Sequence, residues 1–600
     1  MKKFLKYVLA TIVGLAIVNI LFFMIAMGVI GSMAAMGDQT VSVKDNSILE
    51  ISFSNEIQDR ASSNPIDNFD FFSFSTSQPL GLNKILENID KAAKDSRIKG
   101  IYMNLTDINS SFGAMATIEE IRNALLEFKK SGKFIYSYAN FGYSQKSYFL
   151  ATVSDSVFVN PETPLGLLGM RSQTSFYKNV LDKLGIKSEI LKVGKYKSAV
   201  EPFVQTEMSK ENREQVFTYI TSVWNAVTKG ISEERNVSVE ELNTIADNFD
   251  YRSAEEEVKL GLFDGAIYED QMIDILKTRC GLKADDKLPY ITFEKYLKAE
   301  VEGTKKASTK DKIAVIYASG EIGMKQSGVA IGPELAETIR NARKDKNVKA
   351  IVLRINSPGG SALTSDIIWR EVKLAAEAKP FIASMGNVAA SGGYYIACAA
   401  DTIIADPTTL TGSIGVFGLL FSGEKLIKET IGVTTDGVKT NKYSDFGGSF
   451  PLPLPVSSRA FTAYERSVMQ RSVEQTYETF LSRVTEGRGM SRDAVHEIAQ
   501  GRVWTGTDAL KLGLVDMLGG YNDAIRLAAE KAGLENYKIA EYPAEKNPFD
   551  EIFSGLTASI KTRILKEELG VYYDTYNFIK EMTQASEGVV ARIPYNITIE

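Results

Sequence analysis

Histidine is almost absent from this chain of 600 residues, which contains only His496. A catalytic serine–histidine–acid triad must therefore use His496 or not exist. Ala494, Val495 and Ile498 are spaced as on a short surface helix that also carries His496. We therefore do not expect this histidine to be catalytic.

Cysteine is nearly as scarce, with Cys280 and Cys398 far apart in unrelated contexts. Two such residues build neither a disulfide framework nor a zinc site. Cys398 lies in the apolar run YYIACAAD, which predicts a buried helix in which the thiol acts as a small hydrophobic group. We expect no metal and no cofactor.

A strong excess of one charge is also missing, since the formal net charge is −6. Lysines and arginines do not cluster with aromatic residues, so nucleic acid is not an expected partner. Hydrophobic content of 44% and charged content of 24% are typical of a globular protein. The length predicts several domains.

Charged residues are absent from Tyr7 to Ile30, a segment long enough to cross a bilayer as a helix. Basic residues precede it at positions 2, 3 and 6 and none follows until Lys44, which places the N-terminus in the cytoplasm and the rest outside. A cleaved signal peptide ending near Ala34 is the competing interpretation, and a buried core helix is a third. The apolar run exceeds the roughly 7–15 residues of a signal-peptide core, which favours an uncleaved anchor.

The chain contains an internal repeat with a nearly constant displacement. DSRIKGIYMNL from Asp95 pairs with DKNVKAIVLRI from Asp345, 250 residues later. KFIYSYANFGYSQKSYFLA and PFIASMGNVAASGGYYIAC are 247 residues apart, and VKLGLFDG and LKLGLVDM are 252 apart. Such constancy indicates a duplicated unit.

Each copy alternates apolar strand-like runs with helical stretches, which predicts βαβ units and a largely parallel sheet in an α/β fold. In the first copy the expected strands are residues 48–54, 98–105, 134–139 and 157–160. A long amphipathic helix follows in each copy, at 208–231 and 464–487. No proline-rich linker separates the copies, but the polar run from Glu302 to Lys312 is a suitable boundary. The predicted organisation is a membrane anchor (1–37), a first domain (45–301), a second domain (312–547) and a C-terminal tail without counterpart (548–600), in which we expect helices and a terminal strand.

Two glycine loops of the second copy could carry chemistry. RINSPGGS, residues 354–361, follows an apolar strand and precedes a helix, so its backbone N–H groups could hold an oxyanion; an ordinary tight turn is the alternative. GNVAASGGYY, residues 386–395, places Ser391 and the N–H of Gly392 at a helix start. A helix-capping serine is the alternative there.

The first copy lacks both glycine loops. Ser391 aligns with Ser144, but Gly392 and Gly393 become Gln145 and Lys146, and the other loop becomes Ile108-Asn109-Ser110. Glycines needed only for the fold would be present in both copies, so their restriction to one copy favours a site.

Without histidine, a lysine could serve as base, because burial lowers the pKa of an ammonium group. The candidate is Lys197 in VGKYKSAVEPF of the first copy, which aligns with Ser444 in the second. A solvated surface lysine is the ordinary alternative for such a residue.

The motifs INSPGG, GNVAASGGYYIACAAD and TGSIGV, together with VGKYKSAVEPF, resemble the signal peptide peptidase A family, also called protease IV, in its long duplicated bacterial form. The resemblance extends from the anchor to at least Asp516. It implies tandem ClpP/crotonase-like ββα superhelix domains behind a transmembrane helix. It also implies a homotetrameric serine endopeptidase of the bacterial inner membrane, with periplasmic catalytic domains that degrade cleaved signal peptides and other apolar peptides.

The same resemblance assigns roles to individual residues. Ser391 is the implied nucleophile of a serine–lysine dyad and Lys197 its general base. Ser413 helps to hold the lysine, Gly360 and Gly392 donate to the oxyanion, and Gly359 supports the turn. Whether the dyad forms within one chain or between chains stays open.

Two other functions remain as alternatives. A crotonase-like acyl-CoA enzyme would also hold an oxyanion with backbone N–H groups, but it typically needs acidic catalytic residues and a thioester substrate. A decayed protease could act as a membrane scaffold that binds peptides. Intact motifs in the second copy argue against the scaffold.

Overall fold

The computed structural model describes residues 6–7, 13–14, 17, 41–53, 56–61, 69–70, 75–76, 80–105, 114–163, 165–248, 252–301, 309–324, 331–450, 456–544 and 590–592. Over these residues we find no helix with the length and apolarity of a membrane span. The predicted anchor, Tyr7 to Ile30, lies mostly outside the described residues and stays a prediction. Apart from residues 590–592, so does the tail from residue 548.

The first half of the chain builds a six-stranded parallel sheet. Its order is β10-β8-β7-β6-β1-β11, and every neighbouring pair is parallel. The strands are β1 (Ser47–Ile51), β6 (Ile98–Asn104), β7 (Phe134–Ala139), β8 (Ser156–Val159), β10 (Gly265–Ala266) and β11 (Tyr290–Thr292). The helices are α2 (Leu82–Lys94), α3 (Met115–Lys129), α4 (Gln145–Ala151), α5 (Lys178–Leu184), α6 (Lys210–Glu234), α7 (Val239–Asn248), α8 (Ala254–Lys259), α9 (Glu269–Arg279) and α10 (Phe293–Tyr296).

The second half repeats this arrangement in an eight-stranded sheet. Its main order is β21-β17-β15-β13-β12-β23, with β16 beside β15 and β22 beside β16, and only the β17–β21 pair is antiparallel. The strands are β12 (Lys312–Ser319), β13 (Val348–Ser357), β15 (Phe381–Ala390), β16 (Thr402–Ala405), β17 (Leu410–Gly412), β21 (Val503–Thr505), β22 (Met517–Leu518) and β23 (Lys538–Tyr542). The helices are α11 (Glu334–Lys344), α12 (Ala362–Ala376), α13 (Gly392–Ala397), α14 (Ala463–Arg488), α15 (Arg492–Ile498), α16 (Gly506–Lys511) and α17 (Tyr521–Lys531).

The α/β class and the duplication are therefore confirmed. The four expected strands of the first copy appear as β1, β6, β7 and β8, and β1 ends at Ile51, three residues before the predicted end. The two long helices appear as α6 and α14.

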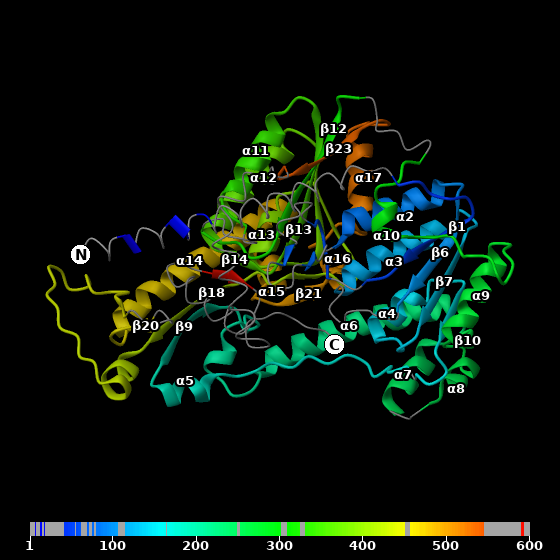
Figure 1. Ribbon diagram of the computed structural model, residues 1–600. Helices are drawn as coiled ribbons and strands as arrows, with labels where there is room; N and C mark the ends of the chain where they lie inside the picture. Colours follow the sequence, from blue (N-terminus) through cyan, green and yellow to red (C-terminus); the bar gives the residue numbers. More distant parts are fainter. Residues whose placement is uncertain are drawn as a thin grey trace.

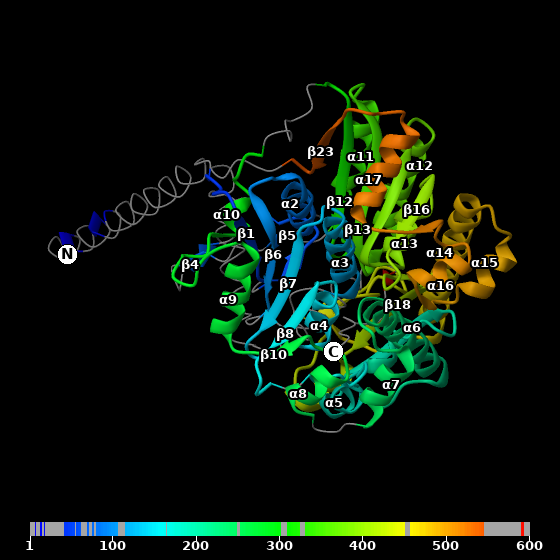
Figure 2. The ribbon, with the colours of Figure 1, turned by 90° about the vertical axis from the view of Figure 1, so that its right-hand side faces the viewer.

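A hydrophobic core joins the two halves. Alternate residues of a strand face opposite sides of a sheet, and in β12 Ile313 and Val315 pack into the same cluster as Leu86 and Ile118 of α2 and α3. Their neighbours Ala314 and Ile316 pack on the other side, with residues of α11 and α12. Helices α2 and α3 consequently lie between the two sheets (Figure 2).

A third, mixed sheet crosses from one half to the other. β9 (Lys187–Val193) does not join the first sheet but pairs antiparallel with β18 (Val416–Ser422) of the second half along its whole length. Figure 1 shows β9 and β18 side by side at the end of α14. This pairing carries the chain that follows β9 to the second half.

The same sheet contains four shorter strands. β14 (Gly359–Ser361), β24 (Val590–Arg592), β18, β20 (Val456–Ser457) and β19 (Ser449–Phe450) follow in that order. β24 thus lies between β14 and β18, antiparallel to both. The strand expected near the C-terminus, residues 592–600, lies outside the described residues except for Arg592, the last residue of β24.

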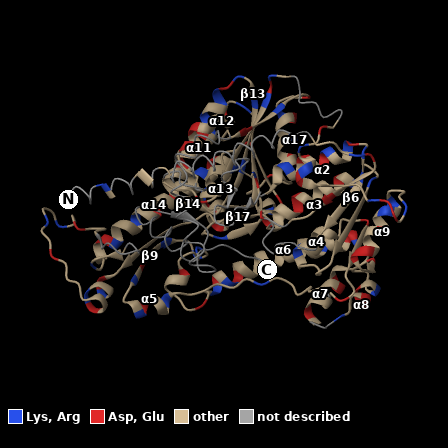
Figure 3. Ribbon diagram, in the orientation of Figure 1, with Lys and Arg blue, Asp and Glu red and all other residues tan. Residues whose placement is uncertain are grey.

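Lysines and arginines are interspersed with aspartates and glutamates along the helices and loops (Figure 3). One charged group lies deep between the halves: Arg354 of β13 is fully buried, and its Nε donates to Asp59 Oδ1 at 2.7 Å. Its Nη2 donates to Glu120 of α3. An unpaired buried charge is costly. Arg354 therefore favours the relative position of the two halves in which Asp59 and Glu120 both reach its guanidinium.

Candidate active site

Ser391 occupies the turn between β15 and α13. Its backbone has φ 56° and ψ −113°, and its N–H donates to the carbonyl oxygen of Gly412 at 2.8 Å. A positive φ is unfavourable for serine, and such strain is found mostly where the surrounding structure enforces it, often at functional sites. Its side chain makes no capping hydrogen bond to α13. The alternative of a helix-capping serine is therefore wrong.

Lys197 reaches Ser391 from the first half of the chain. It follows β9, and its Nζ lies 2.9 Å from Ser391 Oγ. Both side chains are fully buried. The contact is within one chain, 194 residues apart in sequence.

Burial holds the pKa of the Lys197 ammonium group well below its usual range, and no charged neighbour contributes to the shift. The reason is that an apolar environment disfavours the charged form. Lys197 is thus not the solvated surface lysine of the alternative interpretation, and its amine is disposed to accept a proton.

Ser413 also contacts the lysine amine. Lys197 Nζ is 3.1 Å from Ser413 Oγ and 3.3 Å from the Ser413 carbonyl oxygen. Ser413 has a positive φ of 50°, and its N–H donates to the carbonyl oxygen of Arg502 at 2.7 Å. The amine is therefore held by two oxygens of Ser413 as well as by Ser391.

The glycines predicted to bind an oxyanion meet beside Ser391. A Cβ on Gly392 would lie 3.1 Å from the backbone N of Gly360 and 3.1 Å from Cα of Gly359. Gly360 itself has φ 150°, and a Cβ there would lie 2.0 Å from the carbonyl oxygen of Ile322. Only glycine fits at position 360. The backbone at Gly359 and Gly360 and the backbone at Gly392 therefore lie beside Ser391 without intervening side chains.

In the first copy, the position that corresponds to Gly392 carries the side chain of Gln145. Ser144 does cap its helix, since its Oγ accepts a hydrogen bond from the N–H of Ser147. Gln145, which stands where the second copy has Gly392, accepts from the N–H groups of Leu168 and Gly169 at 2.8 and 2.9 Å. Gln145 also donates to the carbonyl oxygen of Gly169 at 2.9 Å. The first copy has therefore replaced open backbone with a glutamine bonded to its own main chain.

His496 lies on α15, as predicted, and its Nδ1 is 3.0 Å from the hydroxyl of Tyr477. Cys398 directly follows α13 and is buried, which confirms its role as a small hydrophobic group. Within the described residues, Lys197 is the only ionisable side chain that hydrogen-bonds to Ser391 Oγ.

Two residues at this site were not predicted from the sequence. Gly501 packs directly on Lys197, and a Cβ there would lie 2.7 Å from Lys197 Cβ. Gln215 of α6 hydrogen-bonds to the residues on both sides of Lys197. Neither belongs to a local motif, and only their positions in space reveal them.

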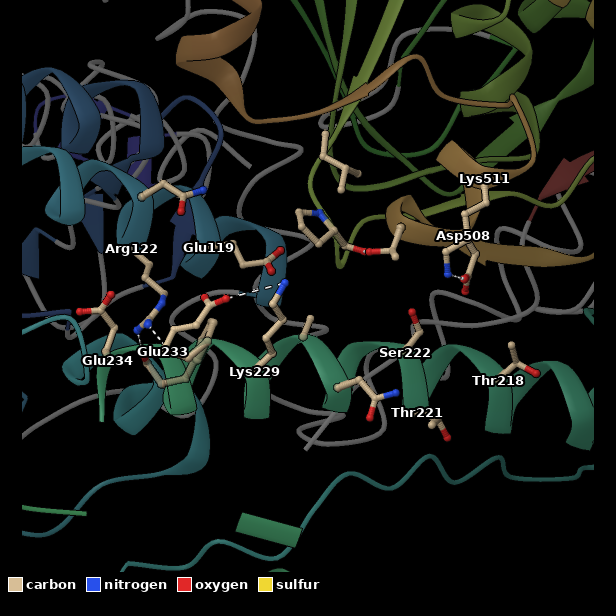
Figure 4. Close-up of a pocket in the computed structure, with 18 of the residues that line it drawn as sticks. Glu119, Arg122, Thr218, Thr221, Ser222, Lys229, Glu233, Glu234, Asp508 and Lys511 are labelled. Atoms are coloured by element: carbon tan, nitrogen blue, oxygen red, sulfur yellow. Dashed lines mark hydrogen bonds and ion pairs between the residues drawn. The ribbon is translucent and has the colours of Figure 1, made fainter. Parts of the chain in front are cut away.

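A separate pocket of about 710 Å³ lies between α3, α6 and the second half (Figure 4). Glu119 lines it, and burial raises the pKa of that carboxyl to about 7. Neither Ser391 nor Lys197 contributes to its lining, so this pocket is not the place where those two residues meet.

A buried serine in a strained turn, beside a buried amine and glycine backbone, is an arrangement typical of hydrolases that use a serine nucleophile. The comparisons identify the class. Peptidase family S49 matches residues 127–283 and again residues 373–535, so the chain belongs to this family and is a serine protease.

Named relatives cover most of the chain. It is 36% identical over 528 residues to serine protease SPPA, chloroplastic, of Arabidopsis thaliana, covering 86% of this chain and 74% of the relative. It is 35% identical to Protease 4 of Haemophilus influenzae (74% and 71% covered) and 34% identical to Protease 4 of Salmonella typhi (81% and 78% covered). The suspected membership of the signal peptide peptidase A family is confirmed.

Proposed function

We propose that Ser391 and Lys197 form the catalytic dyad of this protease. The observation that carries the proposal is the 2.9 Å contact between Ser391 Oγ and an amine whose pKa burial lowers. Neutral Lys197 takes the Ser391 proton as Oγ bonds to the carbonyl carbon of a peptide, and the resulting ammonium returns the proton to the leaving nitrogen. Water then attacks the acyl carbon while Lys197 accepts a proton from it, and the ammonium returns this proton to Ser391 Oγ as the bond from Oγ to the acyl carbon breaks, which releases the new carboxyl group.

Gly360 and Gly392 stabilise the oxyanion through their backbone N–H groups in this mechanism. The adjacency of the two glycines supports this role. Backbone donors fixed before the reaction need no reorganisation as charge develops, which makes them effective catalysts. Gly359 allows the turn, with φ 101°, and Ser413 positions the amine.

Peptide substrates bind as an extended strand between β14 and β18. The support comes from β24, which takes that place with Gly360 opposite Ala591 and Phe417 opposite Val590. A substrate bound in place of β24 would use main-chain hydrogen bonds common to all peptides. Its backbone would run along the loop that holds Gly360.

The remaining predictions form part of the same proposal. The chain has ClpP/crotonase-like domains at 45–301 and 312–547, is anchored by its N-terminal segment in the bacterial inner membrane and assembles as a homotetramer. Its catalytic domains face the periplasm and degrade cleaved signal peptides and other apolar peptides. The apolar segment from Tyr7 to Ile30 and the family membership support this proposal.

A serine-directed fluorophosphonate tests the proposal. We expect phosphorus to bond to Ser391 Oγ with loss of fluoride, because Lys197 removes the hydroxyl proton. Peptide mapping of the labelled protein identifies the modified residue. Ser391→Ala should abolish labelling, and Ser144→Ala, the matched change in the first copy, should leave it intact. Labelling that persists in Ser391→Ala would overturn the assignment, whereas an acyl-CoA enzyme or an inert scaffold would not label at all.

The pH profile of peptide cleavage should show one ionisation on its acid side, the protonation of Lys197. Only neutral Lys197 can act as base, so kcat/KM falls as the pH drops through the lowered pKa of this group and is retained above it. The slope below that pKa should be about tenfold per pH unit, because one proton is bound. A pH profile with a peptide substrate measures this limb, and a rate that increases toward acid pH would contradict a lysine base.

A further inference from the structure

We propose that Gln215 is a positioning residue, which fixes the loop carrying Lys197 against the half of the chain that carries Ser391. The inference rests on the proposed roles of those two residues. Gln215 contacts neither the Lys197 amine nor Ser391 Oγ in any hydrogen bond of the described residues, so it would act through the backbone around them.

One end of the Gln215 side chain holds the loop of the base. Gln215 lies on α6, and its amide is almost fully buried, with 2% of the residue exposed. Its Nε2 donates to the carbonyl oxygen of Tyr196 at 3.0 Å and to Ser198 Oγ at 3.0 Å. These are the two neighbours of Lys197. The bonds restrain the backbone from which the long, flexible lysine side chain extends.

The other end holds the half that carries the nucleophile. Gln215 Oε1 accepts a hydrogen bond from the N–H of Val503 at 3.2 Å. Val503 begins β21 and is paired with Gly412 of β17. The carbonyl oxygen of Gly412 in turn accepts from the N–H of Ser391. A single buried amide thus connects the backbone beside the base to the backbone beside the nucleophile.

The orientation of this amide is set by its surroundings. Asn212 Nδ2 donates to the buried carboxylate of Glu201 at 2.9 Å, so Asn212 Oδ1 faces Gln215 and accepts from its Nε2 at 3.1 Å. The site therefore requires a donor on one side and an acceptor on the other. Glutamine supplies both, leucine supplies neither, and glutamate would place oxygen against oxygen.

Gln215→Leu should lower kcat about 10- to 100-fold while KM changes little, because a small displacement of the base affects the transition state rather than binding. The acid limb of the pH profile should also move to higher pH. Loosening of the loop admits water to the Lys197 amine, and hydration raises its pKa toward the usual value. A role in folding alone would leave the position of this limb unchanged.

Gln475→Leu is the matched control, since the same change is made on the exposed face of the equivalent long helix, α14. It should retain the kcat and the pH profile of the wild type. If Gln215→Leu does not fold, Gln215→Asn replaces it, because asparagine stays polar but is too short to bond both sides. We expect the same shift of the acid limb in that variant.

The outcomes separate this inference from the proposed dyad. A folded Gln215→Leu or Gln215→Asn with wild-type kcat and an unmoved acid limb would overturn the positioning role, even if Lys197→Met is inactive. An active Lys197→Met would instead overturn the dyad.

Discussion

Lys197→Met should be inactive and at least as stable as the wild type. Methionine fills a similar volume without an amine, so no group remains to accept the Ser391 proton, and we expect kcat to fall by at least about 10³-fold. Cleavage of an apolar peptide measures the loss. A variant with near wild-type activity would show that another group serves as base.

The expected stability follows from the lowered pKa of Lys197. Between the lowered pKa of the folded state and the ordinary lysine pKa, the unfolded chain binds a proton on this lysine and the folded chain does not. Stability therefore increases as the pH rises toward the ordinary lysine pKa, and below that pH the buried amine is a cost to folding. Lys197→Met removes this cost, and thermal unfolding at pH 7 should show no decrease in Tm.

Lys195→Met provides the matched control. Lys195 is two residues away and exposed, and its Nζ lies 5.2 Å from the centre of the Tyr196 ring. The Lys195→Met variant should cleave peptides at the wild-type rate. Equal loss in both variants would point to a general effect of charge in this loop instead of a base at position 197.

Gly501→Ala should have the second-largest effect, with a loss of about 10²-fold in kcat from displacement of the base. Gly501 has φ 80°, and an added Cβ would lie 2.7 Å from Lys197 Cβ and 2.8 Å from its Cα. Because these are backbone and near-backbone atoms, the loop of the base has to move. Cleavage kinetics and the rate of fluorophosphonate labelling both report the change.

Gly513→Ala separates this displacement from backbone strain. Gly513 has a similar φ of 74°, but no atom lies within 4 Å of an added Cβ. Both variants therefore carry the conformational cost of alanine at a positive φ, of about 1 kcal/mol. Only Gly501→Ala pushes on Lys197, so Gly513→Ala should retain activity. Equal activity of the two variants would contradict the proposed contact.

The fold was largely predictable because its signals are local. Short apolar runs between helical stretches specified strands such as β6 and β7, and the internal repeat indicated the duplication. Ser391 and the glycine loops could be selected because the first copy lacks the same glycines. Comparing the two copies in this way separates glycines that serve a site from glycines that the fold requires, within a single sequence.

The position of Lys197 depended on long-range pairing that the repeat does not specify. β9 belongs to the first copy by sequence but pairs with β18, and this pairing carries Lys197 to the half that contains Ser391. Gln215 was hidden for a related reason. A glutamine on an amphipathic helix usually marks the solvent side, and its burial follows from contact with the other half.

Under the proposed mechanism, the pairing of β9 with β18 also determines when proteolytic activity can arise during synthesis. Ribosomes make the chain from its N-terminus, and domains generally fold in that order. Lys197, β9 and Gln215 are made first, but β18 and Val503, which bind β9 and Gln215, follow more than 200 residues after Lys197. A nascent chain that ends before Val503 lacks part of this arrangement, so under the proposed mechanism we expect proteolytic activity only after both halves have emerged.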